Sequence, residues 1–157
     1  MANTIPGTAK MIWIADRLGA AGYEWYEISN WARPGHACRH NLLCWTMGEY
    51  VALGGAAHGH RGGTRYWHVR TPERYAAAVE AGDDPVVGTE HLDGSARRLE
   101  ALQLSLRTTA GVPAAALEAE ADALAGLIER EGDRYVLTRQ GRLLANEVAT
   151  RLVDPGP

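Results

Sequence analysis

The chain has no phenylalanine, few cysteines, no long apolar run and no excess of positive charge. Two cysteines cannot form a disulfide framework, and with no recognisable signal peptide they predict a reducing, cytoplasmic compartment. The longest run without Asp, Glu, Lys or Arg is eleven residues, Tyr50 to His60, too short for a membrane helix. A formal net charge of −3 argues against nucleic acid as the main partner.

The composition that remains is that of a globular protein. Of 157 residues, 46% are hydrophobic and 22% are charged. Hydrophobic periodicity predicts a mixed α/β (α+β) fold in the first half of the chain. We expect helices over Gly7–Ala20, Arg39–Met47 and from Pro72 to about Ala81, and strands over Tyr23–Ile28, Tyr50–Ala57 and Thr64–Arg70.

The second half is predicted to be a small helical unit, residues 93–157, after a linker over residues 82–92. Asp93 or Ser95 caps a helix to about Arg107, and Thr138 caps the last helix. A middle helix is predicted from the apolar stripe of Leu117, Ala121, Leu124 and Ile128. A short strand is predicted over Arg134–Leu137, before the last helix. This order suggests a winged-helix-like domain, and its acidic balance favours a packing role over DNA binding.

Candidate chemistry is concentrated between His36 and Trp45. His36, His40 and Cys44 recur every four residues, so a continuous helix would present all three on one face. Imidazole and thiolate are ligands for zinc, iron and haem iron. Alternatively, Cys38 and Cys44 are small buried hydrophobic residues, and a structural zinc site would need four ligands at a recognised spacing.

A second candidate lies at His58 and His60, which follow a glycine-rich segment. Gly54 and Gly55 would let the backbone approach a ligand closely. The simpler interpretation is a tight turn at a strand end with solvated histidines. The sequence has no dinucleotide-binding fingerprint, P-loop or nucleophile elbow.

An ordered series of motifs resembles the radical SAM haem chaperone family, the HemW-like branch of the oxygen-independent coproporphyrinogen III oxidase superfamily. The matching segments are Gly22–Gly35, Cys38–Leu42, Tyr50–His58, Trp67–Arg70 and Leu137–Asn146. The resemblance implies the C-terminal part of a longer protein. Residues 1–81 would then contain the last helix and strands of a radical SAM partial (β/α) barrel with the haem-motif loop, and Met1 would be a truncated or mis-assigned start.

The family's cluster motif, Cys-x-x-x-Cys-x-x-Cys, does not occur in this sequence. The resemblance therefore places the [4Fe–4S] cluster and S-adenosylmethionine only in the full-length parent. We do not expect radical catalysis from this chain alone.

The family's haem-associated signature is His-Asn-x-x-Tyr-Trp, and here it reads His40-Asn41-Leu42-Leu43-Cys44-Trp45. By resemblance, His40 is the haem-iron ligand, and Asn41, Cys44 and Trp45 shape the haem pocket. The departure is Cys44, which puts a thiol where the family has Tyr, one helical turn from His40.

The function implied by the resemblance is a haem chaperone that binds haem and delivers it to an acceptor protein. One alternative is the C-terminal part of a coproporphyrinogen oxidase of porphyrin biosynthesis, and another is a stand-alone zinc or nucleic-acid-binding module. Membrane-associated partners and a homo-oligomer remain open at this point.

Overall fold

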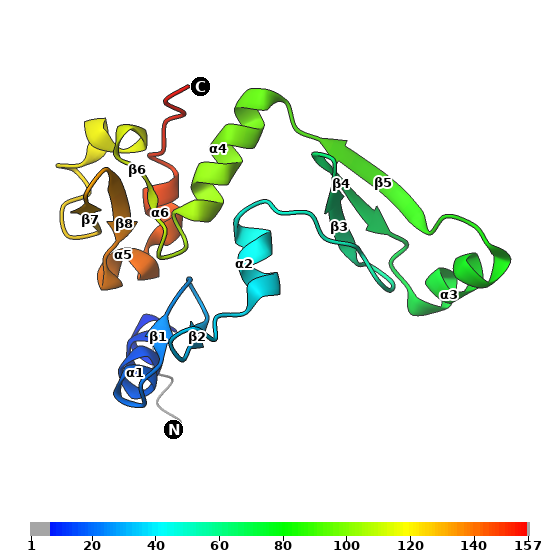
Figure 1. The fold of residues 1–157 in the computed structure, drawn as a ribbon, viewed down its shortest axis with the longest axis horizontal. Helices are drawn as coiled ribbons and strands as arrows, with labels where there is room; N and C mark the ends of the chain where they lie inside the picture. The colour runs from blue at the N-terminus through cyan, green and yellow to red at the C-terminus, as the bar shows by residue number, and fades with distance from the viewer. Residues whose placement is uncertain (1–6, 157) are drawn as a thin grey trace.

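The computed structural model describes residues 7–156. The expectation that Met1 is a truncated or mis-assigned start concerns a residue outside this range. The first group of elements is a helix and a two-stranded ribbon (Figure 1). Helix α1 spans Gly7–Ala20, and strands β1 (Glu24–Trp25) and β2 (Trp31–Ala32) pair antiparallel. The paired rings of Trp25 and Trp31 stack with their centroids 4.9 Å apart.

The second group is a three-stranded antiparallel sheet with two helices, and its strand order is β3-β4-β5. Its elements are α2 (Arg39–Trp45), β3 (His58–Arg61), β4 (Thr64–His68), α3 (Pro72–Ala81) and β5 (Val86–His91). In Figure 1 this sheet and α3 extend away from the C-terminal elements. Strand β5 occupies most of the expected linker, because its backbone completes the ladder of β4.

The third group begins with α4 (Gly94–Ser105) and surrounds a second antiparallel sheet of order β6-β8-β7. Its strands are β6 (Val112–Pro113), β7 (Ile128–Glu131) and β8 (Arg134–Leu137). Its other helices are the 3-10 turns η1 (Ala114–Ala116) and η2 (Glu118–Glu120), then α5 (Arg139–Leu143) and α6 (Ala145–Ala149).

The main hydrophobic core lies in this third group. Its fully buried members include Leu106, Val112, Leu117 and Val148. Ile28 from the first group packs against the same core. The N-terminal elements are therefore attached to the C-terminal core rather than to the β3-β4-β5 sheet.

Arginines from α5 reinforce this attachment. Arg142 donates to the Trp25 carbonyl oxygen at 2.7 Å, and its guanidinium lies over the Trp25 ring. Arg139 pairs with Asp16 of α1 at 2.6 Å. Burial lowers the pKa of Arg142, and the fully buried Glu27 acts in the opposite direction.

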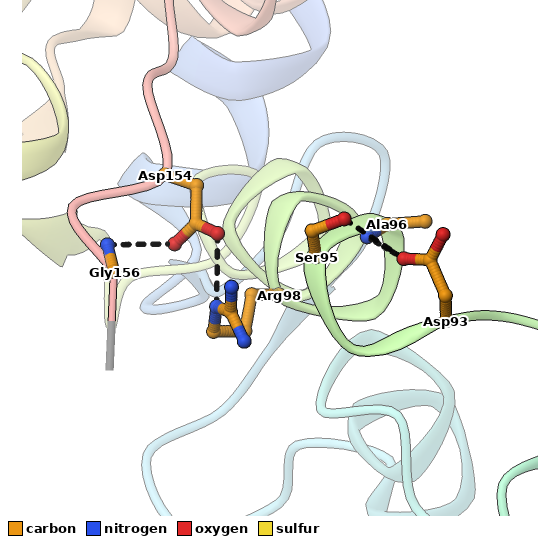
Figure 2. A network of polar contacts seen from close by, with 6 residues as sticks. All are labelled: Asp93, Ser95, Ala96, Arg98, Asp154 and Gly156. Carbon is orange, nitrogen blue, oxygen red and sulfur yellow. Dashed lines mark hydrogen bonds and ion pairs between the residues drawn. The ribbon is translucent and has the colours of Figure 1, made fainter.

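Helix α4 is held at its N-terminus by Asp93 and further along by Arg98, in two small polar networks (Figure 2). The Asp93 carboxylate accepts from the Ala96 backbone N–H and the Ser95 hydroxyl, both at 2.8 Å, and these bonds lower the pKa of Asp93. Arg98 donates to Asp154 at 2.8 Å, which ties the C-terminal segment to the helix.

Several predicted elements are confirmed. Helices α1 and α3 have the expected bounds, and Asp93 and Thr138 cap their helices through their side chains. No helix in residues 7–156 has both the length and the apolarity needed to cross a bilayer.

Other predicted elements are wrong. The expected strand over Tyr50–Ala57 is reduced to one bridge between Tyr50 and His60. The expected middle helix is replaced by η1, η2 and a turn, and Ile128 begins β7 instead. Leu117, Leu124 and Ile128 are nevertheless buried, because turns around Gly126 bring them to the same core.

The core position of Leu106 generates a stability prediction. Leu106→Ala leaves a cavity in a fully buried site and is expected to lower the free energy of unfolding by about 3 kcal/mol. The control is Leu53→Ala, the same chemical change at a side chain that is 81% exposed. Urea unfolding followed by circular dichroism measures both, and equal effects of the two changes would contradict this account of the core.

Candidate functional site

The main cavity of the site has a volume of about 460 Å³ and lies between α2 and α4. The haem-signature helix α2 supplies Asn41, Cys44 and Trp45 to its wall, and Tyr50 follows in the next loop. The remaining wall residues are His58 and Gly59 from β3, Arg65 from β4, and Glu100 and Leu104 from α4. The cavity is therefore built from the second and third groups together.

Helix α2 is short because the sequence limits it at both ends. Pro34 and Gly35 form a turn before it, and Gly35 adopts a positive φ of 77°. At its other end Met47 adopts a left-handed φ of 54°, and the Gly48 N–H returns to the Leu43 carbonyl at 2.8 Å. His36 lies outside the helix, so the stretch is not one continuous helix and His36, His40 and Cys44 do not share one helical face.

His40 and Cys44 remain one helical turn apart on α2, but they have different surroundings. His40 is exposed and does not line the cavity. Its ring meets the edge of the Tyr50 ring, with the centroids 6.1 Å apart. Cys44 is half-buried in the cavity wall, whereas Cys38 is exposed. The thiol therefore lies in the cavity wall, whereas the imidazole is related to the cavity only through its contact with Tyr50.

Asn41 and Trp45 line the same cavity, but they differ in their hydrogen bonding. The Asn41 amide donates to the Tyr26 hydroxyl at 3.1 Å, which connects α2 to the N-terminal group. The indole N–H of Trp45 is buried and has no hydrogen-bond partner among residues 7–156. A buried donor without a partner costs about 1–3 kcal/mol, so an acceptor supplied by a ligand would be favoured here.

Arg65 determines the charge of the cavity. It pairs with Glu90 at 3.3 Å and with Glu100, and the hydrogen bond that Arg65 donates to Glu100 is the main cause that raises the pKa of Arg65. The Glu100 oxygen Oε2 is buried and unpartnered among the described residues. The guanidinium is thus compensated by carboxylates, and the cavity is not a strong anion site.

Tyr50 contributes a neutral phenol. Burial raises the pKa of its hydroxyl, and the charge of Cys44 adds to the shift. The phenol is therefore protonated at neutral pH and offers both an aromatic face and a hydroxyl donor.

Sequence reasoning missed the second histidine of the glycine-rich segment. The interpretation of His58 and His60 as solvated residues of a turn fails for His60, which is only 5% exposed within β3. His58 is exposed and stacks on Trp67 at 5.9 Å. The alternation His58-Gly59-His60 was a strand signal, and Gly59 is needed because a Cβ there would meet the Tyr66 ring.

Comparison with known proteins places these residues in context. No protein-family model matches the chain. Over 143 residues it is 45% identical to a Mycobacterium tuberculosis protein named Heme chaperone HemW, covering 87% of this chain and 37% of that protein. Over 149 residues it is 33% identical to the Bacillus subtilis protein of the same name, covering 86% and 39%.

Among solved structures, the chain is similar to coproporphyrinogen III oxidase (HemN) from Escherichia coli, a radical SAM enzyme. The TM-score is 0.67 at 14% identity, and the match covers 94% of this chain and 41% of the oxidase. The chain thus spans less than two fifths of the two curated relatives, and the structural likeness supports a shared mixed helix and sheet fold.

The environment of Tyr50 gives a pH prediction. The unfolded chain loses this phenolic proton near about pH 10, where the folded chain still holds it. Because the unfolded state then binds fewer protons, the free energy of unfolding should fall as pH rises above about 10. Urea unfolding across this pH range should show a shallower fall for Tyr50→Phe, and an unchanged slope would contradict the burial of the phenol.

Proposed function

We propose that this chain, which is homologous to the C-terminal part of the heme chaperone HemW, forms the haem-binding part of a longer protein that transfers haem to an acceptor protein. The observation that carries the proposal is the shared cavity of Asn41, Cys44 and Trp45. These are three of the four signature residues, and the fourth, His40, stands one helical turn from Cys44.

The walls of the cavity suit a flat, largely apolar ligand with polar edges. Trp45, Tyr50 and Leu104 offer apolar and aromatic surface, and the unpartnered indole N–H of Trp45 offers a donor. A volume of about 460 Å³ is within the range of about 300–1,000 Å³ that is usual for ligand sites.

His40 is the ligand we assign to the haem iron. A neutral imidazole is a common axial ligand, and this one is accessible from solvent. An exposed ligand beside Tyr50 of the cavity wall suits a cargo that must leave again, because the acceptor can approach the iron from outside. Haem would therefore be the cargo of this site and not a resident cofactor.

The residues of this chain do not fit a [4Fe–4S] cluster. A cluster needs several thiolates, and the two cysteines lie apart, Cys38 exposed before α2 and Cys44 half-buried near its end. We therefore assign the cluster and S-adenosylmethionine to the remainder of the parent.

For the finer architecture, we propose that residues 1–81 complete a radical SAM-type barrel and that residues 93–157 form a winged-helix-like domain. Residues 82–92, which include β5, would connect these two parts. The β6-β8-β7 sheet with its flanking helices supports the winged-helix-like domain. Val51 and Leu53 are 69% and 81% exposed, which supports their packing against the rest of a longer protein.

A coproporphyrinogen oxidase remains the second reading of the parent. It is supported by the likeness to the Escherichia coli oxidase, which at 14% identity concerns the fold. The relatives of higher identity are named haem chaperones, and the His40–Trp45 signature agrees with them. We therefore favour the chaperone.

Haem titration of the purified chain tests this proposal. His40→Ala removes the iron ligand and should weaken haem binding at least about tenfold, which corresponds to about 1.4 kcal/mol. The shift of the Soret band measures the affinity. His36→Ala is the matched control, because it removes an exposed imidazole outside α2 and should leave the affinity unchanged. Equal affinities of His40→Ala and the parent chain would overturn the assignment.

A further inference from the structure

We propose that a second, smaller cavity beside the haem cavity binds a single Cu(I) ion through Cys44, Met47 and His60. These three residues line a cavity of about 30 Å³ together with Tyr50, Arg65 and Leu104. A cavity of this size can hold a single ion or water molecule. The site does not depend on the proposed haem binding.

His60 is the first observation that points to a ligand. It is only 5% exposed, and its Nδ1 lies 3.0 Å from the Gly48 carbonyl oxygen. Because a carbonyl oxygen only accepts, Nδ1 carries the proton and Nε2 keeps a free lone pair. Nε2 is therefore the ring atom left available to a ligand. Metal-binding histidines show this arrangement, in which a backbone carbonyl orients the ring through its other nitrogen.

The backbone holds this imidazole in place. Tyr50 and His60 exchange two backbone hydrogen bonds, at 2.9 and 3.0 Å, and His60 also pairs with Arg65 across the β3-β4 ladder. The ring is therefore fixed against the loop that follows α2, and that loop contains Met47.

The two sulfur atoms come from the end of α2. Cys44 lies in its last turn, and Met47 follows three residues later. The Met47 N–H bonds the Cys44 carbonyl at 3.3 Å, so the two residues belong to one turn. Thiolate, thioether and imidazole thus border one atom-sized cavity from two elements, α2 and β3. Cys44 and His60 both line this cavity, and no hydrogen bond joins them in the described residues.

The chemistry of this donor set selects the ion. Thiolate and thioether are soft ligands that favour Cu(I), and imidazole also suits copper. A structural zinc site would need four ligands, and among residues 7–156 no group of three or more His, Cys, Asp or Glu side chains could hold a metal. Binding exchanges the Cys44 thiol proton for Cu(I) and releases that proton to solvent, so the site gains no net charge. The neighbouring Arg65 is already compensated by Glu90 and Glu100.

The test is an anaerobic titration of the haem-free chain with Cu(I) in competition with the chelator bathocuproine disulfonate. We expect one Cu(I) per chain and thiolate-to-copper absorption in the near ultraviolet. Met47→Leu keeps the size and apolar character of the side chain, and Cys44→Ser removes the thiolate. Each should weaken Cu(I) binding at least about tenfold. Cys38→Ser, which changes the exposed cysteine, is the matched control and should bind as the parent does.

Three results would overturn the site. The first is no Cu(I) retained against the chelator, which means that the cavity holds water only. The second is parental affinity in both Met47→Leu and Cys44→Ser, and the third is loss of binding in Cys38→Ser. Met47 does not line the haem cavity, so Met47→Leu should bind haem as the parent does. If the parent chain failed to bind haem, the Cu(I) titration would therefore still decide whether the copper site exists.

Discussion

Helix α4 is the constraint on which the rest of the structure depends, because two different faces of it are used at once. Leu99 and Leu102 pack against the C-terminal core, and Leu106 just beyond the helix is fully buried in it. Glu100 and Leu104 face the cavity between α2 and α4 instead. The stable core, which contains most of the buried apolar side chains, therefore holds one wall of the site in place.

The opposite wall has much less support from burial. Helix α2 has no buried residue. It ends at Trp45, two residues before Met47, whose backbone has a left-handed conformation. Its position depends on polar contacts such as the Asn41 amide on Tyr26, together with the Tyr50–His60 bridge behind it. A site with one rigid wall and one lightly held wall suits a protein that must both bind and release a large ligand.

Much of the local structure could be predicted from the sequence, and the reasons are local. Pro72 and Gly82 limit α3, and Asp93 and Thr138 cap their helices through their own side chains. What the sequence could not predict depended on distant partners. Strand β5 exists because β4 lies beside it, and Leu124 and Ile128 reach the core through turns although their spacing is helical.

The site was predictable in its residue types and less so in its geometry. The signature residues Asn41, Cys44 and Trp45 line a single cavity, whereas His40 does not. The signature did not indicate that Arg65, Glu100 and Leu104 would complete the walls, because these come from β4 and α4, far along the chain. Nor did it indicate the burial of His60, since a two-residue spacing in a glycine-rich segment also fits an exposed turn.

The crystal structure of the chain bound to haem would test the central claim most directly. The account predicts the iron within bonding distance of the His40 imidazole, with the macrocycle against Trp45 and Tyr50 between α2 and α4. Haem seated elsewhere, for example on the exposed face of the β3-β4-β5 sheet with His40 still turned to solvent, would contradict it.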